Sequence, residues 1–197
     1  MRILITGSNG LLGQKLLHKL RQDSSVELIA TSKGVNRVSE QNSYTYFDLD
    51  ITNNDAVAQL IASEKPQVVI NTAAMTNVDL CEDEKQACDA LNVDAVQYLA
   101  DACEKIDAHL IQISTDFIFD GKDGPYDEEA VPNPLSYYGE SKLTAEKLVE
   151  EMSDSWAIAR TVLVYGVADK MSRSNIVLWA KDALEKGKAI NVVNDQW

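Results

Sequence analysis

The sequence has few of the residues that build metal clusters or disulfide frameworks. Its 197 residues include two histidines and three cysteines. His18 and His109 lie far apart in the chain, and no two cysteines have the C-x-x-C spacing typical of zinc and redox sites. We therefore expect no metal site, and reduced thiols at Cys81, Cys88 and Cys103 in a cytoplasmic protein.

Long hydrophobic runs and an excess of positive charge are also missing. No apolar stretch approaches the roughly 18 residues that a membrane-spanning helix needs. The 18 lysines and arginines are outnumbered by 31 aspartates and glutamates, which gives a net charge of −13. This charge disfavours binding to nucleic acid and to anionic membranes. A content of 45% hydrophobic residues fits one globular domain with a full core.

The N-terminal residues predict a dinucleotide site. Arg2–Thr6 is a short apolar strand, the residues GSNGLLG follow at once, and leucines then repeat at helical spacing over 11–20. In this strand–turn–helix unit, Gly7, Gly10 and Gly13 would form a tight turn that brings backbone close to a pyrophosphate. The spacing is G-x-x-G-x-x-G rather than the usual G-x-G-x-x-G. A glycine-rich turn without a ligand is the alternative.

The end of the second predicted strand, 26–31, bears on the choice of dinucleotide. Ser32 and Lys33 follow it, Arg37 is close behind, and no carboxylate stands at the tip. NAD sites usually carry an acidic residue there for the ribose 2′-hydroxyl, whereas a basic residue accommodates a 2′-phosphate. We therefore expect NADP(H) to be preferred, with NAD(H) also admitted. The alternative is that Lys33 is an ordinary solvated loop lysine.

Strands and helices alternate along the rest of the chain. Further strands are predicted at 43–48, 67–72, 108–114 and 156–164, and further helices at 53–63, at 82–105 and from near Ser136. Repeated β-α-β units with buried strands predict an α/β fold with a Rossmann-type, doubly wound parallel sheet. We expect residues 1–165 to form an NAD(P)-binding domain with the catalytic residues, and 166–197 to begin a substrate-binding region.

The predicted helix near Ser136 carries a tyrosine and a lysine one turn apart. Tyr138 and Lys142 share a face with Ala145, Val149 and Met152, which is the spacing of a core-facing stripe. A buried lysine is costly unless it has a task. We predict that Lys142 lowers the pKa of Tyr138 from about 10, so that the phenol can exchange a proton with a carbonyl oxygen. The alternative is an ordinary amphipathic helix.

Four ordered segments resemble the extended short-chain dehydrogenase/reductases. They are TGSNGLLG (6–13), NTAAMTNVD (71–79), STDFIFDG (114–121) and NPLSYYGESK (133–142). Within that superfamily the chain is most similar to the dTDP-4-dehydrorhamnose reductases and related nucleotide-sugar reductases. The resemblance implies that Thr115 binds the substrate carbonyl, that Tyr138 donates the proton, and that Lys142 binds the nicotinamide ribose and tunes Tyr138. It also implies NADPH-dependent reduction of a 4-keto-6-deoxy nucleotide sugar.

Polar residues at the predicted carboxyl ends of the strands extend this set. Asp48 is a candidate acceptor for the adenine amine, and Ala73 and Ala74 would keep the rim of the site narrow. The expected cofactor-binding residues are Gly7, Asn9, Gly10, Leu11, Leu12, Ser32, Lys33, Asp48, Leu49, Ala73, Ala74, Thr76, Asn92, Tyr138 and Lys142. The expected substrate-binding residues are Thr76, Thr115, Asp116, Phe117 and Asn175.

The C-terminal segments resemble the start of the family's substrate lobe. Residues 160–166 are similar to the segment after the sixth strand, and Asn175 lies where a helix that touches substrate begins. Lys170 and Arg173 could face a pyrophosphate, or could be solvated loop charges. The ending, 194–197, resembles the start of a further family motif, so we expect most of the smaller C-terminal lobe to be missing from this chain.

Two other functions stay open at this point. The same fold resembles the regulatory β subunit of methionine adenosyltransferase, which would make the protein a non-catalytic NADP-binding subunit. Another nucleotide-sugar reductase or an epimerase is the second alternative. A dehydratase is disfavoured, because Asp116 and Phe117 follow Thr115 where such an enzyme would show Asp-Glu. Intact Thr115, Tyr138 and Lys142 favour an enzyme, and a homodimer is left open.

Overall fold

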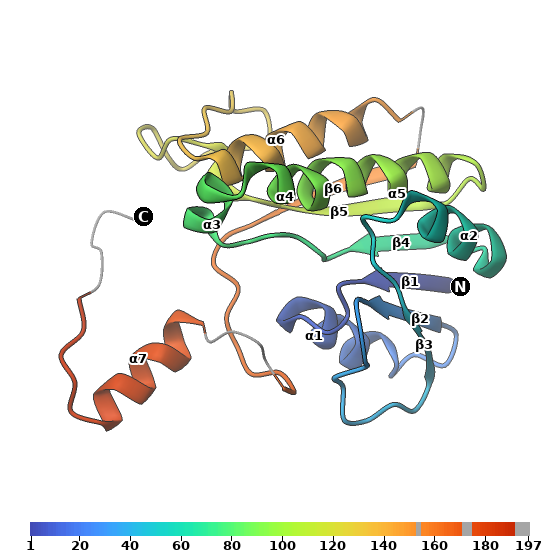
Figure 1. Ribbon diagram of the computed structural model, residues 1–197, viewed down its shortest axis with the longest axis horizontal. Coiled ribbons are helices and arrows are strands. Elements are labelled where there is room, and N and C mark those ends of the chain that lie inside the picture. The colour runs from blue at the N-terminus through green and yellow to red at the C-terminus, as the bar shows by residue number, and fades with distance from the viewer. Residues whose placement is uncertain (153–154, 171–174, 192–197) are drawn as a thin grey trace.

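Six parallel strands form one sheet in the order β3-β2-β1-β4-β5-β6 (Figure 1). The computed structural model describes residues 1–152, 155–170 and 175–191. The strands are β1 (Arg2–Thr6), β2 (Glu27–Ser32), β3 (Tyr44–Asp48), β4 (Val68–Asn71), β5 (His109–Thr115) and β6 (Trp156–Thr161). The strand order reverses between β1 and β4, and ligands of such sheets bind at that switch point. The predicted Rossmann-type α/β fold is confirmed.

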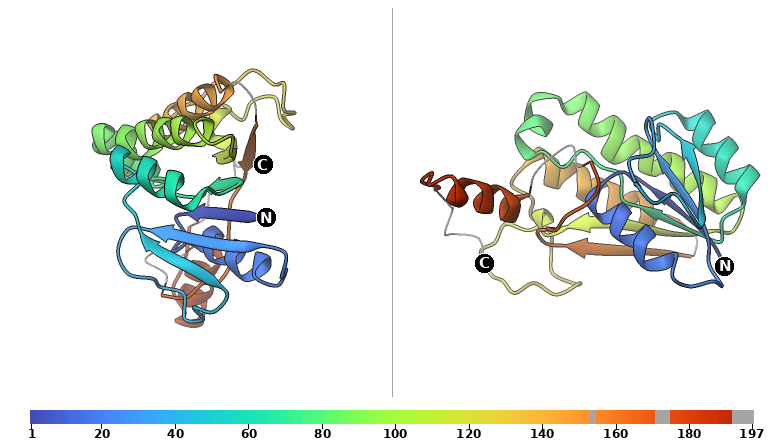
Figure 2. Two further views of the ribbon diagram at one scale, coloured as in Figure 1. Left: turned by 90° about the vertical axis from the view of Figure 1, so that its right-hand side faces the viewer. Right: turned by 90° about the horizontal axis from the view of Figure 1, so that it is seen from below.

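Helices cover both faces of the sheet. They are α1 (Leu11–Leu20), α2 (Asn54–Glu64), α3 (Val78–Asp83), α4 (Lys85–Asp89), α5 (Ala95–Glu104), α6 (Tyr137–Glu150) and α7 (Ile176–Glu185), with a π-helical turn η1 (Ala90–Asp94) and a 3₁₀ turn η2 (Asp116–Ile118). Helices α2, α5 and α6 lie on one face, and α1 lies on the other (Figures 1 and 2). Successive strand residues therefore point into different cores.

Neighbouring side chains along the central strands point alternately into the two cores. Leu4, Val69 and Leu110 pack beneath α2, α5 and α6, and each is fully buried. Ile5, the neighbour of Leu4, points to the other face and packs with Leu17 of α1. Burial on both faces explains why these strands read as continuous apolar runs.

The prediction of one helix over 82–105 is wrong. Glu84 has φ −120° and ψ 57°, which separates α3 from α4, and the π-helical turn η1 precedes α5. The break has a purpose in packing, because η1 turns the Asn92 side chain towards the backbone of Met75. A pattern judged against the 3.6-residue period of an α-helix does not anticipate a π-helical turn, because such turns are rare and are wound with i→i+5 hydrogen bonds.

The prediction that the last strand reaches residue 164 is also wrong. The final pair in the β5–β6 register is Thr115 with Thr161, so β6 has no partner beyond that point. Residues 162–164 leave the sheet and are exposed. The predicted domain boundary at residue 165 stays a prediction.

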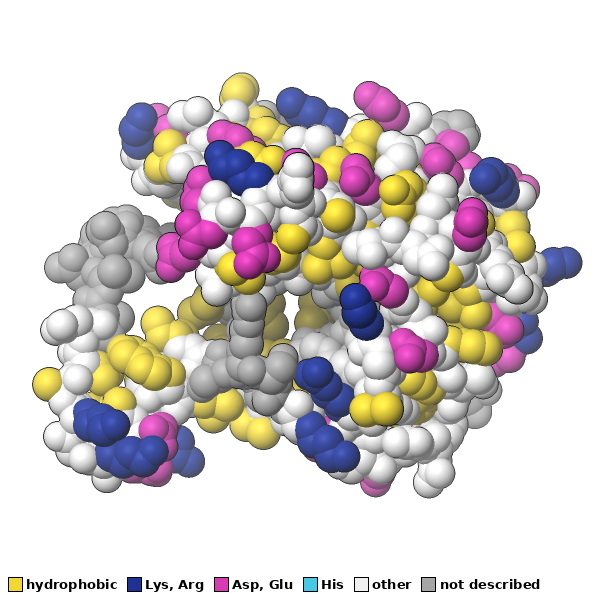
Figure 3. All heavy atoms as spheres, in the orientation of Figure 1, with side chains coloured by type: hydrophobic (Ala, Val, Ile, Leu, Met, Phe, Trp, Pro, Cys, Tyr) yellow, Lys and Arg dark blue, Asp and Glu magenta, His cyan; other side chains and the backbone are white. Residues whose placement is uncertain are grey.

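Helix α7 lies beyond the carboxyl ends of the strands, apart from the helices that cover the sheet (Figures 1 and 2). Hydrophobic side chains are visible on this part of the surface (Figure 3). Two residues of α7, Trp179 and Leu184, are 43% and 63% exposed. Arg173 and the motif at 194–197 lie outside the described residues. Among the helices of the described part, none is long and apolar enough to cross a membrane.

Candidate functional site

Two positions in the turn between β1 and α1 have no room for any residue larger than glycine. Gly7 has a φ of +65°, and a Cβ atom there would lie 2.7 Å from the backbone nitrogen of Ala73. A Cβ atom on Gly13 would lie 2.5 Å from the carbonyl oxygen of Gly7. Gly10 caps α1 without a side-chain hydrogen bond, so the first N–H groups of the helix stay available. A helix N-terminus of this kind can hold a phosphate.

A cavity of about 300 Å³ lies against this turn. Eight of the predicted cofactor-binding residues line it: Gly7, Asn9, Gly10, Ser32, Lys33, Leu49, Ala73 and Ala74. Arg37, Asp50, Ile51, Thr72 and Leu91 line it as well and were not in the predicted set. The cavity therefore joins the glycine turn to the ends of β2, β3 and β4, as expected for a ligand at the switch point.

Asn9, which lines this cavity, and Asp48 both bind the loop that follows β2. The Asn9 side chain donates to the Val35 carbonyl oxygen at 2.9 Å and accepts from the Arg37 N–H at 2.8 Å. The Asp48 carboxylate accepts from the Gly34 N–H at 2.6 Å. Both predicted cofactor residues thus hold the loop in place.

The lining of the cavity carries two basic side chains, Lys33 and Arg37, that differ in exposure and pairing. Lys33 is 80% exposed and pairs with the Asp50 carboxylate at 2.6 Å. Arg37 is half-buried, lines the cavity, and forms no ion pair with any other described residue. Arg37 is therefore the cation better placed to meet an added phosphate. The sequence showed it only as a neighbour of Lys33.

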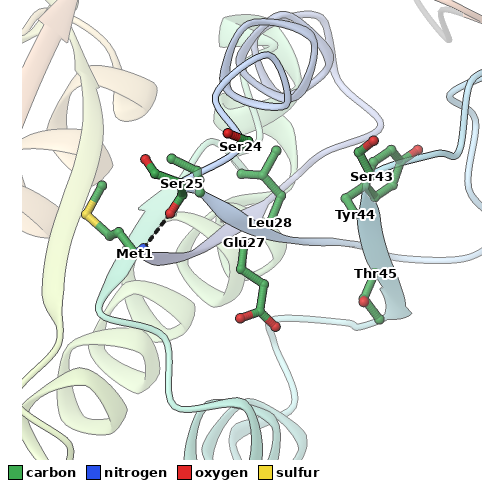
Figure 4. Close-up of a pocket in the computed structure, with 9 residues that line it drawn as sticks. Met1, Ser24, Ser25, Glu27, Leu28, Ser43, Tyr44 and Thr45 are labelled. Carbon is green, nitrogen blue, oxygen red and sulfur yellow. Dashed lines mark hydrogen bonds between the residues drawn. The ribbon is translucent and has the colours of Figure 1, made fainter.

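A larger and more open hollow of about 510 Å³ lies at the amino ends of the strands (Figure 4). Met1, Glu27 and Tyr44 line it, and the Met1 ammonium group donates to the Ser25 carbonyl oxygen at 2.7 Å. Glu27 already pairs with Arg2 at 2.8 Å. Because ligands of open α/β sheets bind at the carboxyl ends, we assign the functional site to the glycine turn instead.

The three predicted catalytic side chains lie where β5 and α6 meet. Thr115 ends β5, while Tyr138 and Lys142 lie on the first two turns of α6; their residues are 6%, 8% and 3% exposed. Ser136 caps α6 by accepting from the Gly139 N–H at 3.2 Å, as the predicted start of this helix requires. Gly139 packs so tightly on the Phe117 carbonyl that a side chain would not fit, which brings α6 up to the end of β5.

Thr115 lies beside the Tyr138 phenol and acts to lower its pKa. The Thr115 hydroxyl donates to Asp116 at 3.0 Å and accepts from the Phe117 N–H at 3.2 Å. The Phe117 ring meets the Tyr138 ring edge-on, with centroids 5.7 Å apart. Asp116 and Phe117 are exposed, and they lie directly beside the buried Thr115 and Tyr138.

The predicted lowering of the Tyr138 pKa is not what the structure shows. Burial raises the pKa of Tyr138, and the nearby Thr115 hydroxyl only works against that rise. The Lys142 ammonium group donates instead to the Ile113 carbonyl oxygen at 2.7 Å. Burial lowers the pKa of Lys142 to about 8, and nearby Glu146 acts in the opposite direction. Tyr138 is therefore a protonated phenol at neutral pH.

Asn92, a predicted cofactor residue, lies behind the site. Its side chain accepts from the Met75 N–H at 2.8 Å and donates to the Met75 carbonyl oxygen at 3.0 Å and to the Ser141 hydroxyl at 3.0 Å. It thus ties the loop after β4 to α6. Thr76 is exposed in that loop. Asn175 directly precedes α7 and caps it by accepting from the Leu178 N–H at 3.2 Å, and its amide donates to the Gly166 carbonyl oxygen at 2.6 Å.

The profile of the RmlD substrate binding domain matches residues 1–197. The chain belongs to this family. The dTDP-4-dehydrorhamnose reductase of Aggregatibacter actinomycetemcomitans is 39% identical over 166 residues, which are 84% of this chain and 52% of that protein. Methionine adenosyltransferase 2 subunit beta of Bos taurus is 33% identical over 196 residues, covering 100% of this chain and 56% of that protein. The chain thus spans about half the length of these curated relatives.

Solved structures of RmlD-type reductases share the architecture of this family member. A dTDP-4-dehydrorhamnose reductase from Clostridium acetobutylicum has 36% identity and a TM-score of 0.80, covering 94% of this chain and 60% of that chain. One from Bacillus anthracis, in complex with NADP, has 31% identity and a TM-score of 0.77, with coverage of 94% and 60%.

Proposed function

We propose that the protein uses NADPH to reduce a 4-keto-6-deoxy nucleotide sugar, converting dTDP-4-dehydrorhamnose to dTDP-L-rhamnose. The observation that carries the proposal is the joint placement of Thr115, Tyr138 and Lys142 at the carboxyl end of β5. The cavity at the glycine turn lies at the same edge of the sheet. The reductases at 39% and 36% identity support the reaction and the sugar.

The lining of the cavity suits the phosphate groups of a phosphorylated dinucleotide. Gly7 leaves room where a Cβ atom would collide with Ala73, and the uncapped N-terminus of α1 offers N–H groups to a pyrophosphate. Arg37 suits the 2′-phosphate that distinguishes NADPH from NADH, and the relative from Bacillus anthracis was solved with NADP. When bound, the cofactor would supply the hydride. NADH could occupy the same cavity without the contribution of Arg37.

The residues of this chain would then bind and protonate the substrate oxygen. With substrate bound, the Thr115 hydroxyl would turn from Asp116 and donate its hydrogen bond to the keto oxygen, which orients that oxygen beside Tyr138. Tyr138 gives its proton to that oxygen, and its raised pKa keeps the phenol protonated until the reaction needs it. Lys142 supplies a positive charge close to the developing phenolate.

Oxidation of NADPH by the full-length protein tests this function. The assay presents dTDP-4-dehydro-6-deoxy-L-mannose alongside other 4-keto nucleotide sugars and follows loss of NADPH absorbance. Turnover of the first substrate supports the proposal, and turnover of another keto sugar alone retains the reductase but changes its substrate. No oxidation with any keto sugar would contradict the reductase.

A non-catalytic subunit is the second candidate, since the matches to methionine adenosyltransferase 2 subunit beta extend over the whole chain. In that case the full-length protein would change the kinetics of a methionine adenosyltransferase without reducing keto sugars. Tyr138→Phe separates the two candidates, because it removes the proton donor of a reductase but leaves a regulatory surface intact.

A further inference from the structure

Three polar side chains form a buried row across the carboxyl ends of β1 and β4 and the middle of β5. Thr6, Asn71 and Gln112 are neighbours in the register of the sheet and are 0%, 1% and 0% exposed. The Thr6 hydroxyl donates to the Asn71 side-chain oxygen at 2.5 Å, and the Asn71 amide donates to the Gln112 side-chain oxygen at 2.8 Å. We call these three residues the polar row.

The polar row ends at the carbonyl group that binds Lys142. The Gln112 amide donates to the Ile113 carbonyl oxygen at 2.9 Å, and the Lys142 ammonium group donates to the same oxygen at 2.7 Å. The β4–β5 register ends with Asn71 opposite Gln112, so Ile113 lies one residue beyond the last pair. Two side-chain donors thus meet at a carbonyl beyond the end of β4.

The other end of the polar row reaches the cavity. Thr6 directly precedes Gly7, and the Asn71 side-chain oxygen also accepts from the Ala73 N–H at 3.2 Å. Gly7 and Ala73 both line the cavity at the glycine turn. A single chain of hydrogen bonds therefore connects the wall of the dinucleotide cavity with the ammonium group of Lys142.

Such a row has a cost that packing alone does not explain. Burying an amide requires every donor and acceptor to find a partner, and apolar side chains would fill the same space without that demand. The residue two positions before each member, on the same face, belongs to the hydrophobic core. On this face of β5, the side chains change from apolar to polar one residue before the carbonyl group that Lys142 binds.

We propose that Gln112 is a positioning residue for Lys142, held in turn by Asn71 and Thr6. Gln112 fixes the direction of the Ile113 carbonyl, and the carbonyl fixes the ammonium group one helical turn from Tyr138. The consequence for turnover rests on the proposed reductase function, whereas the effect on Lys142 does not. The titratable groups that act on Lys142 are Glu146 on its own helix and Cys88 on α4, and neither belongs to the polar row.

The test is a pH titration of the Lys142 side chain by NMR in protein labelled with ¹³C-lysine, with the signal assigned by its loss in Lys142→Arg. Gln112→Glu keeps the size of the side chain but places an oxygen where the amide donor was. Because both nitrogen atoms contact one oxygen, they lie within about 6 Å of each other, a range in which an opposite charge raises a lysine pKa. We expect the titration of Lys142 to move upward by about one pH unit or more.

Gln112→Met removes both hydrogen bonds of the amide without adding a charge. We expect a changed Lys142 signal and a fall in kcat of up to about 100-fold, with little change in the KM for NADPH. Ile61→Val is the matched control, because Ile61 is equally buried, belongs to the core under α2, and has no link to the polar row. It should leave the Lys142 titration and the kcat unchanged.

Unchanged Lys142 titrations in both folded Gln112 variants would overturn the inference, whatever the protein reduces. If the parent protein reduces no keto sugar, the proposed function fails but the NMR result still decides the role of Gln112. Should the Gln112 variants not fold, Thr6→Val breaks the far end of the polar row with a side chain of the same shape. An unchanged Lys142 signal in that variant would equally overturn the inference.

Discussion

Lys142 follows Tyr138 by one helical turn, yet its ammonium group is bound to the Ile113 carbonyl oxygen rather than to the phenol. Burial then dominates the behaviour of both side chains, raising the pKa of Tyr138 and lowering that of Lys142 to about 8. A protonated phenol suits a group that must donate a proton during reduction. Lys142 therefore provides a positive charge near Tyr138, and the Ile113 carbonyl of β5 sets the position of that charge.

Removing the Tyr138 hydroxyl should abolish most turnover of the full-length protein. We expect Tyr138→Phe to lower kcat by about 10²- to 10⁴-fold, the usual range for loss of a general acid, and to leave NADPH binding nearly unchanged. Steady-state kinetics and a fluorescence titration of NADPH measure the two effects. Activity within a few-fold of the parent would mean that another group donates the proton.

The neighbouring tyrosine provides a matched control. The Tyr137 hydroxyl donates to the Asp89 carboxylate at 2.7 Å, which raises its pKa to about 12. This hydroxyl is engaged on α4, away from Thr115. Tyr137→Phe should therefore keep most of the activity that Tyr138→Phe loses.

Arg37 should decide the preference for NADPH over NADH. We expect Arg37→Ala to weaken NADPH binding by about 10- to 100-fold, the value of a hydrogen bond to a charged group, and to leave NADH binding almost unchanged. Lys33→Ala should have the smaller effect, because Lys33 is exposed and already pairs with Asp50. Titrating both dinucleotides by calorimetry gives the comparison, and equal losses for NADPH and NADH would contradict this role of Arg37.

The sequence was sufficient for the parts of the site that local chemistry determines. The glycine spacing predicted the turn at Gly7, and the i, i+4 spacing placed Tyr138 and Lys142 on one buried face, as observed. It failed where the outcome depends on contacts between distant segments. The Lys142 partner is a carbonyl 29 residues earlier in the chain, and Asn92 reaches Met75 through a π-helical turn that no hydrophobic period reveals.

Gln112 and Glu146 also have partners in distant segments that the sequence alone does not identify. A lone glutamine in an apolar strand signals a buried polar group, but its partner Asn71 follows only from the register of β4 and β5. Glu146 continues the spacing of Tyr138 and Lys142 along α6, yet its ion pair with Arg160 of β6 requires the tertiary structure.

Breaking that ion pair should destabilise the fold. The Glu146 side chain is 2% exposed, and Arg160 contacts it through two nitrogen atoms, one of them at 2.8 Å from the carboxylate. We expect Glu146→Ala to lower the free energy of unfolding by about 3 kcal/mol, because it leaves a largely buried guanidinium group without its partner. Urea denaturation measures the change. Lys147→Ala, on the neighbouring exposed position of α6, should cost less than about 0.5 kcal/mol, and similar losses in both variants would argue against the ion pair.

Replacing Lys142 with methionine should stabilise the protein at neutral pH while it removes activity. Burial lowers the lysine pKa from 10.5 to about 8, and each pKa unit corresponds to about 1.4 kcal/mol. The unfolded chain therefore holds this proton more tightly, so the lysine costs the parent protein up to about 3 kcal/mol of stability below pH 8. This cost shrinks as the pH rises from about 8 towards 10.5, where both states become neutral.

The difference between parent and Lys142→Met should follow that window. Glu146 keeps Arg160 as its partner in the variant, and the other titrating groups are common to both proteins, so their contributions cancel in the difference. Urea denaturation at a series of pH values should show a stability gain for Lys142→Met that is constant below about pH 8 and declines above it. A stability gain that is absent at pH 7, or that does not decline towards pH 10.5, would mean that Lys142 is not held as a buried charge. The polar row would then have no buried ammonium group to position.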